Sequence, residues 1–244
     1  MSSQNLTPAA APSAPAPQGL TYEDTADWLR RFADAARAVE GELTELDQRA
    51  GDGDFGANLV SGTEGVRSAL DAPASGPRTP AAPLATAARV FLDHVGGTSG
   101  PLFGLLFQEL AAAVAAGGGM AGPAELAAGT AAGAAAVQRV GEAEVGDKTM
   151  VDALVPAADA LARALLAHPG GEGPVIDPLR ALHGAAVAAH RGARATSALR
   201  ARRGRASYTG DHARGVPDPG ALAVALLFAS ASAPLTTLAQ LPDA

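Results

Sequence analysis

Apolar residues recur along this chain at the spacing of an α-helix. Between Thr25 and Leu46 they fall roughly 3.6 residues apart, which places one apolar stripe on a single helix. The stripe consists of Trp28, Phe32, Val39, Leu43 and Leu46. A second stripe predicts another helix from the positions of Leu84, Ala88, Phe91, Leu92 and Val95.

Prolines and aspartates mark where further helices should start. Pro123, Pro178 and Pro219 suit a first helical turn, and Asp177 and Asp218 directly precede two of them as N-caps. We therefore expect helices over 101–116, 123–140, 150–167, 178–202 and 219–231. Pro156 falls inside one of them and should kink or restart it. The segments Asp71–Pro83 and Gly170–Pro174 are expected to be exposed loops.

The composition also favours helices. The chain is rich in Ala and Gly, only 4% aromatic, and thin in Val, Ile and Tyr, which disfavours strands and suits closely packed helices. We therefore predict an all-α fold: about seven or eight helices around one core. Residues 1–20, rich in Ala and Pro, cannot bury enough apolar surface to offset their entropy. They are expected to form a disordered tail, and residues 21–244 one domain.

Charge and hydropathy exclude several classes of protein. The net charge of −7 argues against nucleic-acid binding, which rests on a basic surface. The start of the chain lacks the basic and apolar regions of a secretory signal. The longest apolar run, Ala221–Ala233, is too short to span a bilayer. With no cysteine, thiolate metal sites are excluded. We expect a cytoplasmic protein without a membrane partner.

Three aspartates lie within eight residues, in the segment LDQRAGDGDFGAN that starts at Leu46. Asp47 falls near the end of the first predicted helix, and Asp52 and Asp54 lie in the glycine-rich turn that follows. Glycines allow such a turn to bring oxygens together, and crowded carboxylates repel one another unless a cation lies among them. An all-oxygen set suits Mg²⁺ or Ca²⁺. Because Mg²⁺ usually shares its ligands with phosphates, we also expect a phosphate-bearing ligand.

Other interpretations of this turn remain. The spacing differs from that of an EF-hand loop, which needs oxygen ligands at alternate positions and a terminal Glu. The simplest alternative is a solvated Asp-Gly turn that binds no ion.

Two loops precede predicted helices. The segment Gly96–Pro101 (GGTSGP) exposes backbone N–H groups, and Thr98 or Ser99 can cap the helix, so it is a candidate anion site. It lacks the Gly-Lys-Ser/Thr ending of a Walker A loop. The segment Gly146–Met150 (GDKTM) is either a helix start capped by Asp147 or Thr149 or part of a nucleotide site.

The single basic cluster in this acidic chain spans residues 200–205. It is either a solvated helix end or a source of a phosphate contact through Arg205, which follows a glycine. Asp218 is most simply an N-cap. The five histidines show no metal-ligand spacing.

Taken in order, these segments resemble the L subunit, the nucleotide-binding domain, of dihydroxyacetone kinases. The matching blocks are LDQRAGDGDFGAN, GGTSGPLFG, GDKTM, GRASYTG and DPGA, and they span Leu46 to Ala221. Fatty-acid kinases share a related domain, but the last two blocks are closer to the dihydroxyacetone kinase type.

The resemblance implies a barrel of eight antiparallel helices with the nucleotide capping one end. It implies that Asp47, Asp52 and Asp54 hold two Mg²⁺ ions that bridge the phosphates of ADP or ATP. The remaining nucleotide contacts implied are Phe55, Gly56, Ala57, Asn58, Gly97, Thr98, Ser99, Gly141, Met150, Arg205, Asp218, Pro219 and Gly220. No residue would act covalently, because phosphoryl transfer is a matter of positioning and charge neutralisation by the ions and Arg205.

The resemblance also implies a partner. In that family the ketose is bound by a separate K subunit or domain, so we expect it on another polypeptide. The phosphoryl donor is either exchanging ATP or a phosphotransferase-system protein that rephosphorylates a tightly held ADP. A homodimer is left open.

The chain departs from the family pattern in two places. Phe55 stands where His is usual, and a phenyl ring cannot donate to phosphate. Asp211-His212-Ala213 stands where Glu-Arg-Ser is usual. Three hypotheses follow: a kinase subunit for a small ketose, a nucleotide-binding regulator that has lost transfer, and a metal-dependent phosphohydrolase. The last lacks an evident base for water.

Overall fold

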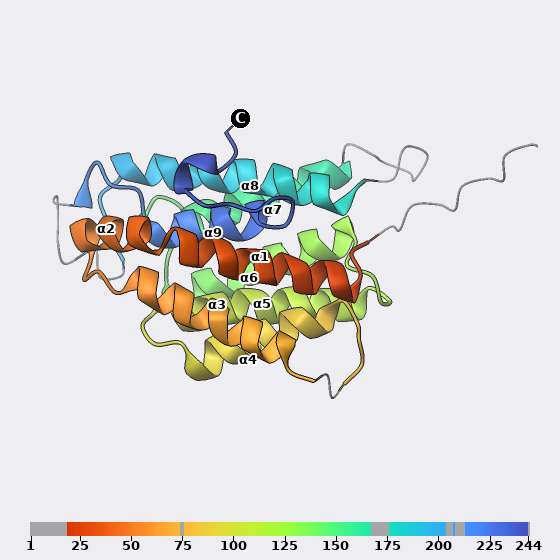
Figure 1. Ribbon diagram of the computed structural model, residues 1–244. Helices are drawn as coiled ribbons and strands as arrows, with labels where there is room; N and C mark the ends of the chain where they lie inside the picture. Colours follow the sequence, from red (N-terminus) through yellow and green to blue (C-terminus); the bar gives the residue numbers. More distant parts are fainter. Residues whose placement is uncertain (1–18, 74–75, 167–175, 204–206, 208–212, 244) are drawn as a thin grey trace, which may run out of the picture.

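The computed structural model describes residues 19–73, 76–166, 176–203, 207 and 213–243, and this part of the chain is helical (Figure 1). The prediction of an all-α fold is confirmed, since the described ranges contain α-helices, short 3₁₀ turns and one isolated β-bridge. The proposed tail falls almost entirely outside these ranges. The α-helices are α1 (Tyr22–Ala38), α2 (Glu40–Ala50), α3 (Phe55–Asp71), α4 (Ala81–His94), α5 (Ser99–Ala116), α6 (Pro123–Gly141), α7 (Val151–Leu166), α8 (Pro178–Ala195) and α9 (Pro219–Ala229).

The helices form a closed ring. α1 packs on α3, and from α3 onward each helix packs on the next until α9 returns to α1, while α2 extends beyond α1 and packs on α3. Neighbouring helices around the ring run in opposite directions, as expected for a barrel of antiparallel helices (Figure 1). The turn between α2 and α3 therefore lies at one end of the barrel, together with the starts of α5 and α9.

Helix starts follow the signals in the sequence. Thr21 caps α1 in a capping box with Asp24. Asp177 and Asp218 accept hydrogen bonds from Leu179 N (3.0 Å) and Ala221 N (2.8 Å), so both are N-caps as predicted.

The predicted helix over Thr25–Leu46 is two helices. It begins earlier, at Tyr22, and a single non-helical residue, Val39, separates α1 from α2. Val39 and Gly41 are both poor helix formers, and Val39 is fully buried. The apolar stripe therefore continues across the interruption of the helix at Val39, which the spacing of the apolar residues does not reveal.

The helix α3 has no counterpart among the helices predicted from the sequence. Its glycines weaken a helix on propensity grounds, but the packing explains them. A Cβ atom at Gly62 would lie 2.8 Å from the ring of Phe91, and one at Gly65 would lie 2.9 Å from Val90. The glycines therefore let α3 approach α4 closely.

Of the two outcomes predicted for Pro156, a kink or a restart of the helix, the restart does not occur, since α7 runs through it. Proline at this position leaves the carbonyl of Asp152, four residues earlier, without its helical partner. Gly192 of α8 lies against that carbonyl, so closely that a Cβ atom there would be 2.0 Å from the oxygen. The two helices thus meet at a proline and a glycine.

The helix predicted over 178–202 ends at Ala195 and is followed by a 3₁₀ turn, Thr196–Ala198. The Thr196 hydroxyl donates to Ala193 O at 2.5 Å and that of Ser197 to Arg194 O at 2.8 Å. These bonds give the last helical carbonyls partners other than the next helical turn. The predicted loop 71–83 is shorter, since α4 begins at Ala81, and the loop predicted over 170–174 lies outside the described residues.

The core is built around phenylalanines of α1, α4 and α5. Phe91, Phe103 and Phe107 are buried, with ring centroids 5.4 to 6.4 Å apart. Among the described residues, α5 is long and apolar enough by composition to cross a membrane. That is weak evidence, because a helix at the centre of a core passes the same test, and α5 packs between α4 and α6.

Two side chains of α1 close the ring onto α9. The Trp28 indole N–H donates to Leu227 O at 2.7 Å. The Arg31 guanidinium donates to Ser230 O at 2.8 Å and to Ala231 O at 2.7 Å. The first helix of the ring is therefore hydrogen-bonded to the last.

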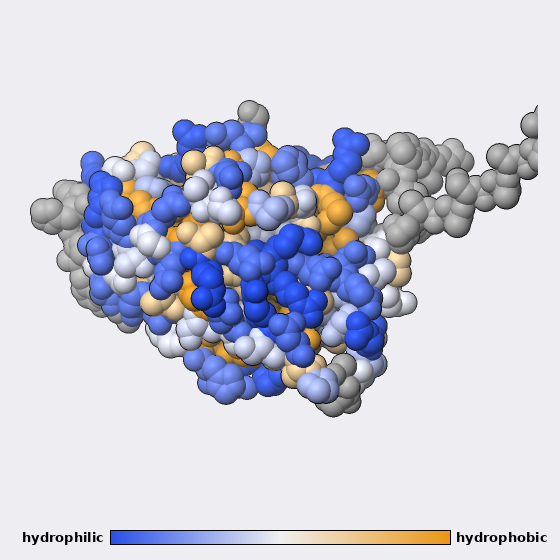
Figure 2. All heavy atoms as spheres, viewed as in Figure 1, coloured by the Kyte–Doolittle hydropathy of each residue, from blue (hydrophilic) through white to orange (hydrophobic). Residues whose placement is uncertain are grey.

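Charged side chains gather where α1 and α3 face solvent (Figure 2). Each arginine there lies against one or two acids, for example Arg30 with both Asp27 and Asp71 at 3.0 Å. We call this surface the α1–α3 face; its residues are Asp27, Arg30, Asp34, Arg37, Glu64, Arg67 and Asp71.

Candidate functional site

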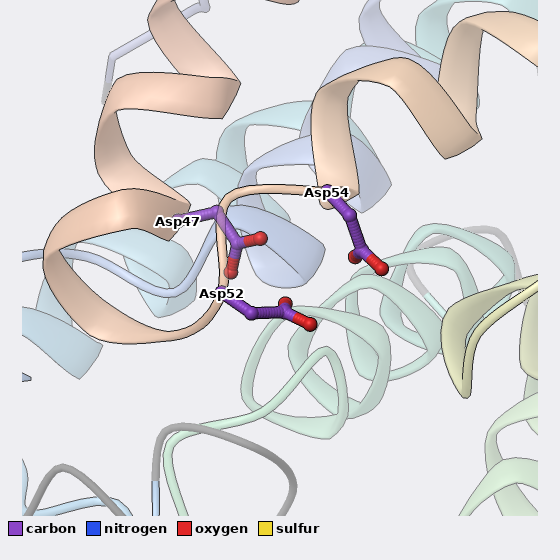
Figure 3. A group of neighbouring side chains, drawn as sticks. All are labelled: Asp47, Asp52 and Asp54. Atoms are coloured by element: carbon purple, nitrogen blue, oxygen red, sulfur yellow. The ribbon is translucent and has the colours of Figure 1, made fainter.

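The three aspartates of the glycine-rich turn come together at one end of the barrel (Figure 3). Asp47 projects from the last turn of α2, Asp52 from the turn, and Asp54 from the residue that precedes α3. One carboxylate oxygen from each lies within 4.8 Å of the others. The sequence predicted this cluster from spacing alone, and the backbone turn produces it.

Local backbone contacts fix the turn. Asp47 is buried, and its Oδ2 accepts a hydrogen bond from Phe55 N at 3.0 Å, so the end of α2 is tied to the start of α3. Gly53 has φ +80°, a left-handed conformation that glycine adopts without strain. At Gly51 a Cβ atom would lie 2.5 Å from Asp47 Oδ1. These two glycines are therefore needed for the carboxylates to meet.

A cavity opens beside the carboxylates, and most of the predicted site residues line it. Besides the three aspartates they are Phe55, Gly97, Thr98, Ser99, Gly141, Met150, Asp218, Pro219 and Gly220. They come from the starts of α3, α5 and α9, the end of α6 and the loop before α7. Segments up to 170 residues apart in the sequence thus share one cavity.

The α5 side of the cavity offers backbone donors. Gly97 has φ +75°, and Thr98 precedes α5 without a side-chain capping bond. The first N–H groups of a helix have no intrahelical acceptor and carry the positive end of its dipole. This side of the cavity can therefore accept an anion.

Three predicted nucleotide contacts do not line the cavity. Gly56 is buried against α2, where a Cβ atom would lie 2.6 Å from Glu40 O, and Ala57 is exposed. Asn58 is half-buried and next to Gly97, 3.3 Å from the position of a Cβ there. A side chain at the start of a helix can point away from the site that its neighbours form, which the sequence motif does not show. Arg205 lies outside the described residues.

The cavity is also lined by residues that were not among the predicted site residues: Ala50, Leu102, Val137, Ala143, Lys148, Thr149, Val151 and Arg203. Most are apolar, and only the tertiary fold brings them here. Arg203 lies 3.6 Å from Glu142, at the end of α6. Lys148 stood inside the GDKTM block, but a lysine is normally at the surface and nothing in the sequence marked it as buried.

The charges in this cavity are unusual. Burial raises the pKa of the Asp218 carboxyl to about 7, against the opposing effects of the Ala221 N–H and the Lys148 ammonium. Burial also lowers the pKa of Lys148, although Asp218 and Asp152 act in the other direction. Among the described residues, four aspartates line the cavity against one lysine and one arginine, an excess of negative charge that favours the arrival of cations.

The chain matches a known family and several of its members. The DAK2 domain matches residues 49–233. The chain is 40% identical over 217 residues to the L-erythrulose 1-kinase of Mycolicibacterium smegmatis, covering 85% of this chain and 35% of the relative. It therefore spans about a third of that kinase.

Other relatives are matched over most of their length. The ADP-binding subunit DhaL of the PEP-dependent dihydroxyacetone kinase of Escherichia coli is 35% identical over 209 residues, covering 86% of this chain and 95% of the relative. The solved dihydroxyacetone kinase of C. freundii in complex with AMP-PNP and Mg²⁺ is 26% identical with a TM-score of 0.61, over 93% of this chain and 37% of that one. With the family match covering well over half of its length, this chain belongs to the DAK2 domain family.

Proposed function

We propose that this chain binds the magnesium complex of ADP or ATP and serves as the nucleotide-carrying part of a kinase for dihydroxyacetone or a related small ketose. The observation that carries the proposal is that groups suited to a metal, to phosphate and to an apolar ring lie together. Three carboxylates, the open start of α5 and an apolar wall meet in one cavity. These are the parts that a metal–nucleotide complex requires.

The carboxylates fit magnesium. Asp47, Asp52 and Asp54 offer only oxygen atoms, the ligands that Mg²⁺ prefers, and one oxygen of each lies within 4.8 Å of the others. We propose that they hold two Mg²⁺ ions. When bound, such ions neutralise charge on the transferred phosphoryl group and hold it in line.

The other cavity residues are suited to the rest of the nucleotide. The N–H groups around Thr98 and Ser99 would donate to phosphate oxygens, as helix starts do. Met150, Phe55 and Val137 are buried and line the cavity, so they would exclude water and pack against an apolar ring face. Arg205 is proposed as a further phosphate contact on the strength of the resemblance alone.

The relatives support the choice of ligand and reaction. The E. coli and Listeria innocua relatives are named ADP-binding subunits of PEP-dependent dihydroxyacetone kinases, and the C. freundii kinase was solved with AMP-PNP and Mg²⁺. The erythrulose kinase and the triokinases are much longer chains of which this one covers about a third. We propose that a K-type subunit or domain supplies the ketose. We propose as the donor either ATP or a phosphoprotein that rephosphorylates bound ADP; the two DhaL relatives are named PEP-dependent.

Removal of two carboxylates tests the binding site. We expect Asp52→Ala with Asp54→Ala to abolish the Mg²⁺-dependent protection of the protein by ADP against heat, measured as the shift in Tm. The matched control is Glu45→Ala with Asp93→Ala, which removes the same charge from exposed positions outside the cavity. If the Asp52/Asp54 variant is protected as well as wild type, the site is wrong.

An assay of phosphoryl transfer distinguishes a kinase subunit from a nucleotide-binding regulator. Phe55 favours the regulator, because its ring, buried to 8% exposure at the cavity, stands where an imidazole is usual. We expect ATP, dihydroxyacetone and a K-type subunit to give dihydroxyacetone phosphate only when this chain is present. Nucleotide binding without transfer in that assay would instead indicate a regulatory module.

A further inference from the structure

A lysine is buried beside the candidate nucleotide cavity. Lys148 is 1% exposed, and its ammonium donates to Thr196 O at 2.6 Å and to Val216 O at 2.5 Å. Burial of an ammonium group is costly unless hydrogen bonds and opposite charges compensate. A methionine would fill similar space at lower cost, so the charge calls for a reason beyond packing.

The loop that carries Lys148 is itself held in place. Lys148 has φ +64°, a left-handed conformation that is strained for a residue with a side chain. Asp152 holds the loop on both sides, since its oxygens accept from Gly146 N at 2.6 Å and from Thr149 N at 2.8 Å. The ammonium therefore projects from a fixed point.

Both carbonyls that bind Lys148 are tied to one segment, the residues that lead into α9. Val216 is two residues before Asp218 in the chain. Thr196, at the end of α8, contacts the same segment, because its Oγ1 accepts from Asp218 N at 2.7 Å. Lys148 thus fixes both Val216, two residues before Asp218, and Thr196, which binds the backbone of Asp218.

What these bonds hold is one wall of the cavity. Asp218 caps α9 through Ala221 N, and Asp218, Pro219 and Gly220 all line the cavity. We infer that Lys148 is a positioning residue: its buried ammonium, through Thr196 and Val216, fixes the Asp218–Gly220 wall against which the nucleotide binds. The inference rests on the proposed function and adds to it a residue that holds the wall of the site in place.

Replacement of the ammonium by an uncharged group of similar length tests this role. We expect Lys148→Met to raise the Kd for Mg²⁺–ADP at least about tenfold, equivalent to about 1.4 kcal/mol. In the nucleotide-free protein, amide hydrogen exchange should quicken in residues 216–222, whereas exchange in α5 should stay as in wild type.

Arg31 provides the matched control. Its side chain also donates to two backbone carbonyls, those of Ser230 and Ala231, but at the other end of α9. That end is about 16 Å from Asp218 at 1.5 Å per residue. Arg31→Met should therefore lower Tm without changing the Kd for Mg²⁺–ADP or exchange at 216–222.

A second background separates positioning from direct contact. If Lys148 acts through the wall, then adding Lys148→Met to Asp218→Ala should change the Kd less than about twofold, because coupled residues are not additive. An undiminished effect in that background would overturn the inference, as would unchanged affinity and exchange in Lys148→Met alone.

Two further results keep the test decisive. Should Lys148→Met fail to fold, Thr196→Val removes the acceptor of Asp218 N and must produce the same loss of affinity and protection, or the inference is wrong. Should wild type bind no Mg²⁺–ADP, the proposed function fails. The exchange measurement then still decides whether Lys148 holds the wall.

Discussion

Acidic residues are arranged in opposite ways on the α1–α3 face and in the turn between α2 and α3. On the α1–α3 face the acids meet arginines: Arg37 lies 2.9 Å from Glu64, and a hydrogen bond to Asp34 raises the pKa of Arg67. In the turn, the carboxylates of Asp47, Asp52 and Asp54 face one common space, with an oxygen of each within 4.8 Å of the others (Figure 3). The first arrangement pairs opposite charges, and the second groups like charges, which a bound cation would stabilise. This difference distinguishes a structural charge cluster from a functional one.

Replacement of an aspartate by asparagine should have opposite effects on ligand-free stability in the two regions. The largest expected effect, however, is on ligand affinity in the turn. Asp47→Asn keeps an oxygen that can accept from Phe55 N but removes one charge from the cluster. We expect the Kd for Mg²⁺–ADP to rise at least about tenfold. The stability of the ligand-free protein should be unchanged or higher, since repulsion is relieved. Calorimetric titration and urea unfolding measure the two quantities, and a loss of ligand-free stability would contradict the comparison.

The next effect concerns pH. Because burial raises the pKa of Asp218 to about 7, the folded state holds a proton that the unfolded state has released. This stabilisation is complete below about pH 4 and is lost as pH rises to 7 and above, at about 1.4 kcal/mol per unit of pKa difference. Asp218→Asn can still cap α9 but cannot bind this proton. Its free energy of unfolding should therefore fall less than that of wild type between pH 4 and 8, by a few kcal/mol at most. Urea midpoints from pH 4 to 8, without metal or nucleotide, test it; parallel slopes would disprove it.

The smallest effect lies on the α1–α3 face. Asp34→Asn removes the ion pair with Arg67 and should lower the free energy of unfolding by less than about 1 kcal/mol, as for other exposed pairs. The loss should shrink in high salt, where wild type also loses the attraction. Nucleotide affinity should not change. A variant as stable as wild type at low salt would show that these arginines do not stabilise the fold.

The sequence predicted the helical class, most helix starts and the carboxylate cluster, because each depends on neighbouring residues. Asp177 and Asp218 cap the helices that follow them, and Gly51 and Gly53 fold the turn in which they lie. The prediction failed where the conformation of a segment depends on residues far away in the sequence. The glycines of α3 are explained only by α4, which no local pattern reveals.

The same distinction holds within the candidate site. Phe55 and Met150 line the cavity as the resemblance implied, but Gly56 and Ala57 do not, since adjacent residues of a helix point in different directions. Lys148 could not be identified from its neighbours in the chain. Its two acceptors, Thr196 and Val216, are 48 and 68 residues away.

The closure of the ring by α1 and α9 affects how the protein is made. The Trp28 bond to Leu227 joins residues 199 positions apart, so α1 leaves the ribosome long before its partner exists. At roughly 5–20 residues per second, about 10 to 40 seconds of synthesis separate the two. During that time α1 can pack on α3 and α4, but the part of its apolar side that contacts α9 stays uncovered. Chaperones that bind exposed apolar segments of nascent chains should therefore engage this helix until α9 emerges.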